Sequence, residues 1–384
     1  MKKTIYLDNA GATPIDPKVK RVILAYLEKF GNVSSVHTAG REAKEIIDAA
    51  RKTVASIINA RPEEVVFTSS GTESANLAVL GVARANKEKG KHIITTQTEH
   101  PAVLKACEYL EKNEGFKVEY LEVEDSGIIN PLTLKNVLRK ETVLVSVMYA
   151  NNEIGTIQPI QEISKIIRRF EKENQIRVIF HTDACQAAGA LNLDVQKLGV
   201  DSMTLNGSKI YGPKGTGCLF VRQGIKLMPV ILGGGQERGL RDGTEKPALI
   251  AGFAEALKIV DQNKEKESKR QTKLRDRLIS EILKSIPDSR LNGDAKLRLP
   301  NNINISFKDV DGEMLMLFLD RKGICISTGS ACSSQEIGPS RVMKAIKNPN
   351  GWGNIRISLG LKTTRKELEW TLELIKKEVE NLRK

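Results

Sequence analysis

The chain has 384 residues, of which 40% are hydrophobic and 28% charged, and its formal net charge is +13. This composition is typical of a soluble globular protein, and no apolar run approaches the ~18 residues of a membrane-spanning helix. The positive charge suits either an acidic partner or a solvated basic surface. No aromatic-rich RNA-reading motif accompanies it, so we favour the solvated surface and expect neither a nucleic-acid nor a membrane partner.

The cysteines, the histidines and the N-terminus bear on metal binding and compartment. The five cysteines are scattered without a CxxC pair, which argues against a zinc site and against a disulfide framework. The four histidines also lack metal-ligand spacing, so we expect no resident metal. The N-terminal stretch MKKTIYLDNAGATP lacks the apolar core of a signal peptide, which predicts a cytoplasmic protein.

Strand-like apolar runs alternate with amphipathic helical stretches from Glu63 to about Leu219. The runs are VVFTSS, HIITTQ, KVEYLEV, TVLVSVMYA, RVIFHTDA, SMTLNGS and GCLFVR, and helical patterns cover residues 73–89 and 160–173. This order predicts an α/β domain with a mostly parallel, seven-stranded sheet. Its functional groups are expected at the carboxyl ends of the strands.

A charged segment from Lys258 to Lys284 predicts one exposed helix that links two bodies. Beyond it, NNINISF, residues 313–323, CISTGS, NIRISLG and the stretch from Arg365 predict a smaller α+β domain. The first dozen residues are extended in character and are expected to pack with that second body. We therefore predict a large domain of residues 15–260 and a small domain of residues 1–14 plus 261–384.

One lysine, Lys209, lies between the small residues Asn206, Gly207 and Ser208 and a loop rich in glycine and proline. Small neighbours let the backbone turn sharply and bring a bulky group close. A lysine held in this way can form a Schiff base with an aldehyde cofactor, whereas a loop lysine is more often a solvated charge.

The stretch TSSGTESAN ends a strand and starts a helix, with Ser70, Gly71 and Thr72 at the junction. Free backbone N–H groups at a helix start can bind an anion. Ser70 and Glu73 also have the spacing of a capping box, which needs no ligand. Both interpretations stay open.

Asp183 follows the buried run VIF, where a carboxylate is costly unless it is paired. A pyridinium nitrogen would be such a partner, and a helix cap or local turn is the alternative. Gln186 is placed to bond a ring oxygen. His100 follows a strand and could stack on a flat cofactor and move protons, although a lone histidine is more often a satisfied polar residue.

Downstream motifs add an amide, a thiol and a guanidinium. Asn151 and Asn152 end a buried run and either form a turn or contact the cofactor. Cys332 lies in a loop of glycine and serines, which favours a redox or nucleophilic role. Arg356 has apolar neighbours and suits either a bidentate carboxylate ligand or an ordinary ion pair.

In this order, the motifs resemble those of the cysteine desulfurases, which are pyridoxal-phosphate enzymes of the class V aminotransferase superfamily. The resemblance runs from YLDNAGATP at Tyr6 to RISLGLKTT at Arg356, and its most specific stretches are ANNEIGTIQP, KIYGPKGTG, GGGQERGLRDGT and STGSACSS. The long segment after Cys332 is similar to that of the NifS/IscS-type group. The resemblance implies the fold-type-I architecture of pyridoxal-phosphate-dependent transferases, with the cysteine loop in the small domain.

The resemblance also implies a role for each motif residue. Lys209 would hold pyridoxal 5'-phosphate and move the Cα proton, and His100 would stack on the ring and transfer protons. Cys332 would be the nucleophile that takes the sulfur, and Arg356 would bind the substrate carboxylate. The other cofactor contacts would come from Gly71, Thr72, Asn152, Asp183, Gln186, Asn206 and Ser208, and from Thr244, which would reach the neighbouring subunit of a homodimer.

The implied reaction converts L-cysteine to L-alanine and leaves a persulfide on Cys332. The sulfur would pass to an acceptor such as an iron–sulfur scaffold protein, with which Cys332 could transiently share a cluster, or a tRNA-thiolation enzyme. The chain departs from the family pattern where Asn206-Gly207-Ser208 replaces the usual Ser-Gly-His. A selenocysteine lyase, another class V enzyme and a weakly active sulfur-transfer scaffold remain alternatives.

Overall fold

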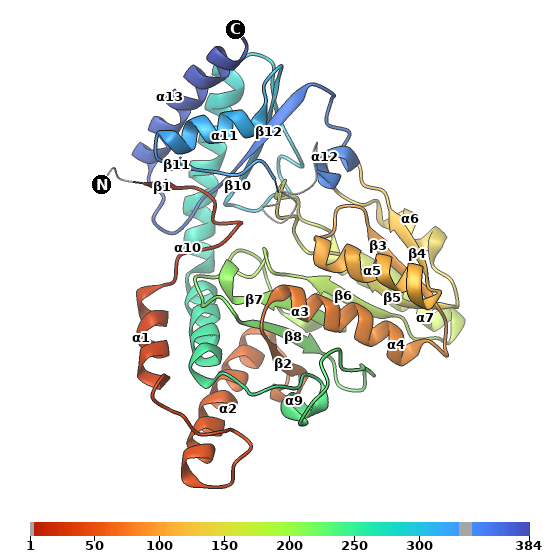
Figure 1. The fold of residues 1–384 in the computed structure, drawn as a ribbon. Coiled ribbons are helices and arrows are strands. Elements are labelled where there is room, and N and C mark those ends of the chain that lie inside the picture. Colours follow the sequence, from red (N-terminus) through yellow and green to blue (C-terminus); the bar gives the residue numbers. More distant parts are fainter. Residues whose placement is uncertain (1–3, 330–339) are drawn as a thin grey trace.

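The computed structural model describes residues 4–329 and 340–384, and Figure 1 shows two bodies joined by a long helix. The larger body is built on a seven-stranded sheet of order β2-β8-β7-β6-β5-β3-β4. Its strands are β2 (Val65–Thr68), β3 (His92–Thr96), β4 (Lys117–Leu121), β5 (Thr142–Ser146), β6 (Ile179–Asp183), β7 (Ser202–Asn206) and β8 (Gly217–Val221). The two pairings of β8, with β2 and β7, are antiparallel and the other four pairings are parallel, so the mostly parallel sheet predicted from the sequence is confirmed.

Helices cover both faces of this sheet. Alternate strand residues separate the two faces: Ile94 and Phe180 pack in the cluster that holds α2 and α7, whereas Ile93 and Ile179 pack against α3 to α5. The helices are α1 (Pro17–Tyr26), α2 (Thr38–Ile58), α3 (Gly71–Asn76), α4 (Val82–Asn86), α5 (Pro101–Glu114), α6 (Pro131–Val137), α7 (Ile160–Asn174), α8 (Val195–Leu198) and α9 (Gln236–Gly239). The predicted helix over 73–89 contains a π-helical turn at Leu77–Gly81 between α3 and α4.

The smaller body combines a three-stranded antiparallel sheet with helices. The sheet has the order β12-β10-β9, from β9 (Ser289–Leu291), β10 (Asn302–Lys308) and β12 (Trp352–Ser358). Its helices are α11 (Gly312–Arg321) and α13 (Arg365–Leu382), whereas α12 (Arg341–Ala345) packs Val342 and Met343 in the core of the large body. Near the chain start, β1 (Ile5–Tyr6) pairs in parallel with β11 (Ile324–Cys325), so these two residues pack with this body.

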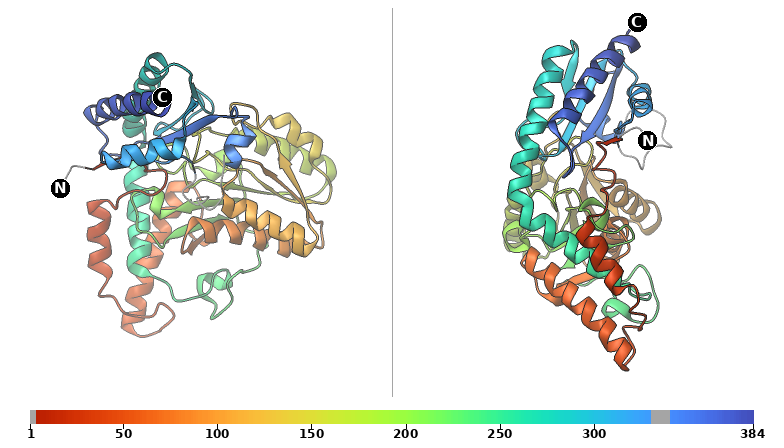
Figure 2. Two further views of the ribbon diagram at one scale, coloured as in Figure 1. Left: turned by 45° about the horizontal axis from the view of Figure 1, so that its top comes forward. Right: turned by 90° about the vertical axis from the view of Figure 1, so that its left-hand side faces the viewer.

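The long helix α10 (Pro247–Ser285) runs along both bodies, as the two views of Figure 2 also show. Phe253 and Leu257 near its start pack in the large core, and Leu278 and Ile282 near its end pack in the small core. The expectation of an exposed helix is therefore wrong for one face, because apolar residues at both ends anchor it. Residue 260 lies inside this helix, and the division at that residue stays a prediction.

No helix in residues 4–329 and 340–384 is both long and apolar enough to cross a membrane.

Candidate active site

A cavity of about 140 Å³, here called the front cavity, lies at the carboxyl ends of the parallel strands, between the two bodies. Nine of the predicted site residues line it: Gly71, Thr72, His100, Asn152, Asp183, Gln186, Asn206, Lys209 and Arg356. Eight of these lie at or after the carboxyl ends of β2, β3, β5, β6 and β7, which meet at one edge of the sheet. Arg356 comes from β12 of the small body.

Lys209 ends the 3₁₀ turn Gly207–Lys209, which follows β7 directly. Its Nζ donates to the carbonyl oxygens of Ala10 at 3.0 Å and Gly11 at 2.5 Å. Gln186 Nε2 donates to the same Ala10 oxygen at 3.0 Å. The N-terminal segment therefore supplies the acceptors that hold both the lysine and the glutamine at the cavity.

Asp183 is the last residue of β6 and is only 7% exposed. Its Oδ1 accepts the backbone N–H of Cys185 at 2.9 Å, so the predicted turn forms and the carboxylate still lines the cavity. Burial and this carboxylate raise the pKa of the Cys185 thiol well above its ordinary value. Cys185 is therefore an uncharged part of the cavity wall.

The turn before α3 forms another part of the cavity wall, beside Cys185 and Asn206. Ser70 Oγ accepts the Glu73 N–H at 3.1 Å, which is half of the predicted capping box, while Glu73 pairs with Arg241 at 2.7 Å. The first N–H groups of a helix lack partners within it, and here Gly71 and Thr72 bring theirs to the cavity they line. A Cβ built on Gly71 would lie 2.8 Å from Cys185 Sγ, so glycine keeps this wall open.

His100 is the N-cap of α5, and its Nδ1 accepts the Ala102 N–H at 3.1 Å. Because Nδ1 accepts this bond, a neutral ring carries its proton on Nε2. Nε2 is therefore the ring nitrogen that can exchange a proton with a ligand. The preceding residue, Glu99, is 3% exposed; one carboxylate oxygen accepts the Met148 N–H and the other has no partner among the described residues. Burial, reinforced by nearby Asp183, raises the pKa of Glu99 well above its ordinary range.

The sequence left open whether the two asparagines after β5 form a turn or contact the cofactor, and the structure places them differently. Asn151 is fully buried and forms the turn: its Oδ1 accepts the N–H groups of Glu153 and Ile154 at 2.8 and 3.0 Å. Asn152 lines the cavity, and its backbone oxygen accepts a hydrogen bond from Arg356 Nη1 at 3.1 Å. Of the two asparagines, Asn152 is therefore the one placed to contact a ligand in the cavity.

Arg356 is 1% exposed and crosses from the small body to the large one. Besides Asn152, its guanidinium pairs with Asp8 through Nη2 at 2.7 Å, while Nε is buried and has no partner in residues 4–329 and 340–384. The ion pair proposed as the simpler interpretation exists, yet the guanidinium also lines the front cavity. Sequence reasoning missed Asp8 as its partner, although Asp8 lies within the motif YLDNAGATP.

Two other predicted residues that the structure describes, Ser208 and Thr244, are not among those that line the front cavity. Ser208 donates its N–H and hydroxyl to Asn206 Oδ1, both at 3.1 Å. Thr244 lines a separate cavity of about 20 Å³, beside a loop that the Glu73–Arg241 pair and a buried Arg51–Glu237 pair hold in place. Cys332 lies outside the described residues.

Comparison with known proteins assigns the chain to a family. The model of the class V aminotransferases matches residues 5–370. The chain therefore belongs to the class V aminotransferase family. This class V chain is 48% identical to the cysteine desulfurase IscS of Dictyoglomus turgidum over 100% of its own length and 96% of that protein. It is also 46% identical to IscS of Methanosarcina thermophila, over 99% of this chain and 93% of that one.

Comparison with solved structures supports the same family assignment. A NifS-like protein superposes on this class V chain with a TM-score of 0.91 at 34% identity, over 99% of this chain and 100% of that one. The structure of SspA in complex with cysteine has a TM-score of 0.79 at 34% identity, over 93% and 99% of the two chains. These likenesses confirm the predicted fold-type-I architecture.

The front cavity fits the pyridoxal 5'-phosphate that class V enzymes use, which confirms the cofactor prediction. A buried carboxylate at Asp183 suits a protonated ring nitrogen, since an unpaired one would be costly there. The backbone N–H groups at Gly71 and Thr72 suit a phosphate. Lys209 supplies the amine for an aldehyde.

Proposed function

We propose that this chain is a cysteine desulfurase that converts L-cysteine to L-alanine and carries the released sulfur as a persulfide on Cys332. The observation that supports this most directly is the meeting of Lys209, Asp183 and Arg356 at one cavity. The curated relatives that match the whole chain at 43–48% identity are named cysteine desulfurases. L-cysteine is therefore the substrate that we assign to the front cavity.

The residues around the cavity divide the work of holding the cofactor. Lys209 would bind its aldehyde, Asp183 its ring nitrogen, and Gly71 and Thr72 its phosphate. Gln186, Asn152, Asn206 and Ser208 complete the proposed contacts around the ring and phosphate. When bound, pyridoxal phosphate supplies an electron sink that makes the Cα proton of an amino acid acidic.

The chain's own groups would then bind the substrate and move its protons and sulfur. The Arg356 guanidinium binds the carboxylate of L-cysteine, and Lys209 Nζ takes the Cα proton. His100 Nε2 exchanges a proton with the reacting groups. The Cys332 thiolate attacks the substrate sulfur, so that an S–S bond forms as the Cβ–S bond breaks and its electron pair stays on carbon.

We further propose a homodimer in which Thr244 reaches the phosphate of the neighbouring active site. Large exposed apolar side chains gather in two segments: Leu24, Leu27, Phe30 and Val36 around the end of α1, and Met228, Val230, Ile231 and Leu232 before α9. Phe30 and Val36 are 90% and 88% exposed, which is costly in water unless a partner covers them. Light scattering should give a dimer, and Phe30→Glu should shift it toward monomer.

The persulfide sulfur would pass to an acceptor, for which an iron–sulfur scaffold protein or a tRNA-thiolation enzyme has suitable chemistry. We also propose a cytoplasmic location, since Cys107, Cys185, Cys218 and Cys325 are free thiols, as is usual in a reducing compartment. Affinity purification from the native cell would identify the acceptor, and fractionation of that cell would test the location.

Purified protein with pyridoxal phosphate, L-cysteine and a reductant tests the function. We expect alanine and sulfide in equal amounts, abolished in Lys209→Ala. Sulfide release by Cys332→Ala as fast as by the parent would refute the nucleophile assignment. Turnover of selenocysteine but not of cysteine would favour a lyase, and failure to bind the cofactor would favour a scaffold.

A further inference from the structure

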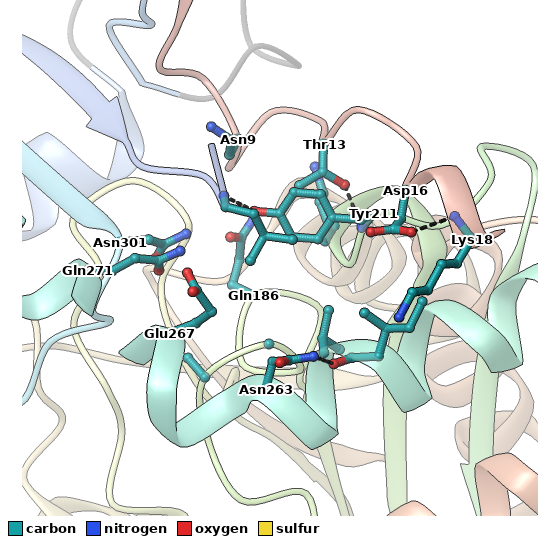
Figure 3. Close-up of a pocket in the computed structure, with 16 residues that line it drawn as sticks. Asn9, Thr13, Asp16, Lys18, Gln186, Tyr211, Asn263, Glu267, Gln271 and Asn301 are labelled. Carbon is teal, nitrogen blue, oxygen red and sulfur yellow. Dashed lines mark hydrogen bonds between the residues drawn. The ribbon is translucent and has the colours of Figure 1, made fainter. Parts of the chain in front are cut away.

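A second cavity, here called the back cavity, lies behind Lys209 and has a volume of about 270 Å³ (Figure 3). Lys209 and Gln186 line both the front and the back cavity. Helix α10 forms one wall with Ile259, Asn263, Glu267 and Gln271, which share one helix face at a spacing of four residues. The lysine amine is thus placed between the proposed substrate site and a second, polar space.

The back cavity leads from a buried end to the surface. Its inner residues Asn9, Thr13 and Gln271 are buried, whereas Lys18 and Asn263 at its rim are exposed. Figure 3 shows Gln271 and Asn301 on one side of the cavity and Lys18 on the other, with Asn263 on α10 below. A polar route therefore connects Lys209 to solvent without crossing the front cavity.

Several polar groups at this cavity have no partner among the described residues. The Gln271 side chain is 8% exposed and makes no hydrogen bond there, and the Asn301 amide likewise makes none. Tyr211 accepts the Leu361 N–H at 3.0 Å, but no described group accepts its hydroxyl proton. Burial raises the pKa of Tyr211 to about 12, so the hydroxyl keeps that proton at neutral pH. Polar groups that face a cavity and lack a protein partner are commonly satisfied by ordered water.

The backbone at Tyr211 adds an independent observation. Its φ of 63° lies in the left-handed region, which is costly for an aromatic residue. The chain holds this conformation two residues after Lys209, with the Tyr211 N–H donated to Thr13 Oγ1 at 2.7 Å. This conformation is the one in which the phenol ring lines the back cavity.

We propose that the back cavity binds a chain of water molecules through which the Lys209 amine exchanges protons with bulk solvent. In each exchange an N–H bond of the Lys209 ammonium breaks as an O–H bond to the first water forms, and a proton leaves at the rim. Gln271, Asn301 and the Tyr211 hydroxyl hold the waters. The proposal rests on the proposed role of Lys209 as the base, because the substrate then fills the front cavity and leaves the rear route open.

Isotope transfer tests the proposal. L-cysteine deuterated at Cα is converted in ordinary water, and the deuterium kept in alanine is measured by mass spectrometry. The wild type should lose most of the label, because the lysine proton exchanges during turnover. Gln271→Leu combined with Asn301→Leu should raise retention several-fold, and Gln262→Leu, an exposed position outside the cavity on the same helix, should match the wild type.

A second readout is independent of turnover. Crystals of the cofactor-free wild type should show ordered waters from Lys209 to Asn263, and Asn301→Leu alone, the milder change, should interrupt them. Equal label retention in the wild type and in a folded double variant, or a dry back cavity, would overturn the proposal. Alanine formation by Lys209→Ala at the parent rate would instead overturn the assignment of the base.

Discussion

The two bodies contribute to the front cavity in different ways. The large body places its residues just after the carboxyl ends of neighbouring strands, so that Asp183, Asn206 and Lys209 are positioned by local turns. The small body contributes Arg356, which is held by Asp8, 348 positions away in the chain, and by a carbonyl of the large body. The proposed cofactor half of the site is thus preset by the sheet, whereas the proposed substrate half, at Arg356, depends on contacts between distant segments.

The largest effect should come from the preset half. Asp183→Asn keeps an oxygen for the Cys185 N–H but removes the charge, so the fold should be retained while kcat falls by about 10²–10³-fold. Steady-state kinetics and the visible spectrum of the cofactor would measure this. An unchanged kcat would contradict the proposed cofactor role of Asp183, because the carboxylate at the end of β6 would then have only a structural role.

The layer beneath Asp183 should control stability with pH. His181 is fully buried between Ser146 and Thr204, and burial lowers its pKa from 6.5 to about 4. As pH falls, the imidazole takes up a proton in the unfolded chain before it does so in the folded one. The free energy of unfolding should therefore decrease progressively, by up to about 3 kcal/mol, as pH falls from 6.5 to about 4. Urea unfolding at pH 7 and pH 5 should show a larger loss in the wild type than in His181→Gln, and equal losses would contradict the assignment.

A substitution of Arg356, in the proposed substrate half of the site, should mainly raise KM. Arg356→Lys keeps a charge for Asp8 but loses the guanidinium fork, so kcat/KM for cysteine should fall by about 10- to 100-fold, mostly through KM. Lys362→Arg, in the loop after β12, offers a control that leaves the cavity untouched. A loss in kcat with KM unchanged would show that Arg356 serves the reaction rather than the carboxylate.

The smallest effect should come from restoring the family pattern at Ser208. Ser208 lies beside the front cavity but bonds to Asn206, so Ser208→His should change cofactor affinity by at most about fivefold. A titration of cofactor-free protein with pyridoxal phosphate measures this. A much larger gain would mean that the histidine contact dominates retention in the family.

The difference between the two halves also explains what the sequence could predict. The periodicity of apolar residues, the strand-like runs and the turn residues are local features of the sequence. They were therefore enough to predict the sheet and the residues at the ends of its strands. The Asp8–Arg356 pair, the burial of the Glu99 carboxylate and the back cavity arise from long-range packing, which carries no local pattern. The buried ends of α10 were missed for a related reason, because its charged middle masks the apolar residues at either end.

Lys209 is the residue that we propose holds the cofactor, and every other assigned role is placed around it. Protein incubated with pyridoxal phosphate, reduced with borohydride and digested should give a single modified peptide, with the cofactor on Lys209. Mass spectrometry of that digest is the most direct test. Attachment to another lysine, or no attachment to the intact protein, would contradict the site described here.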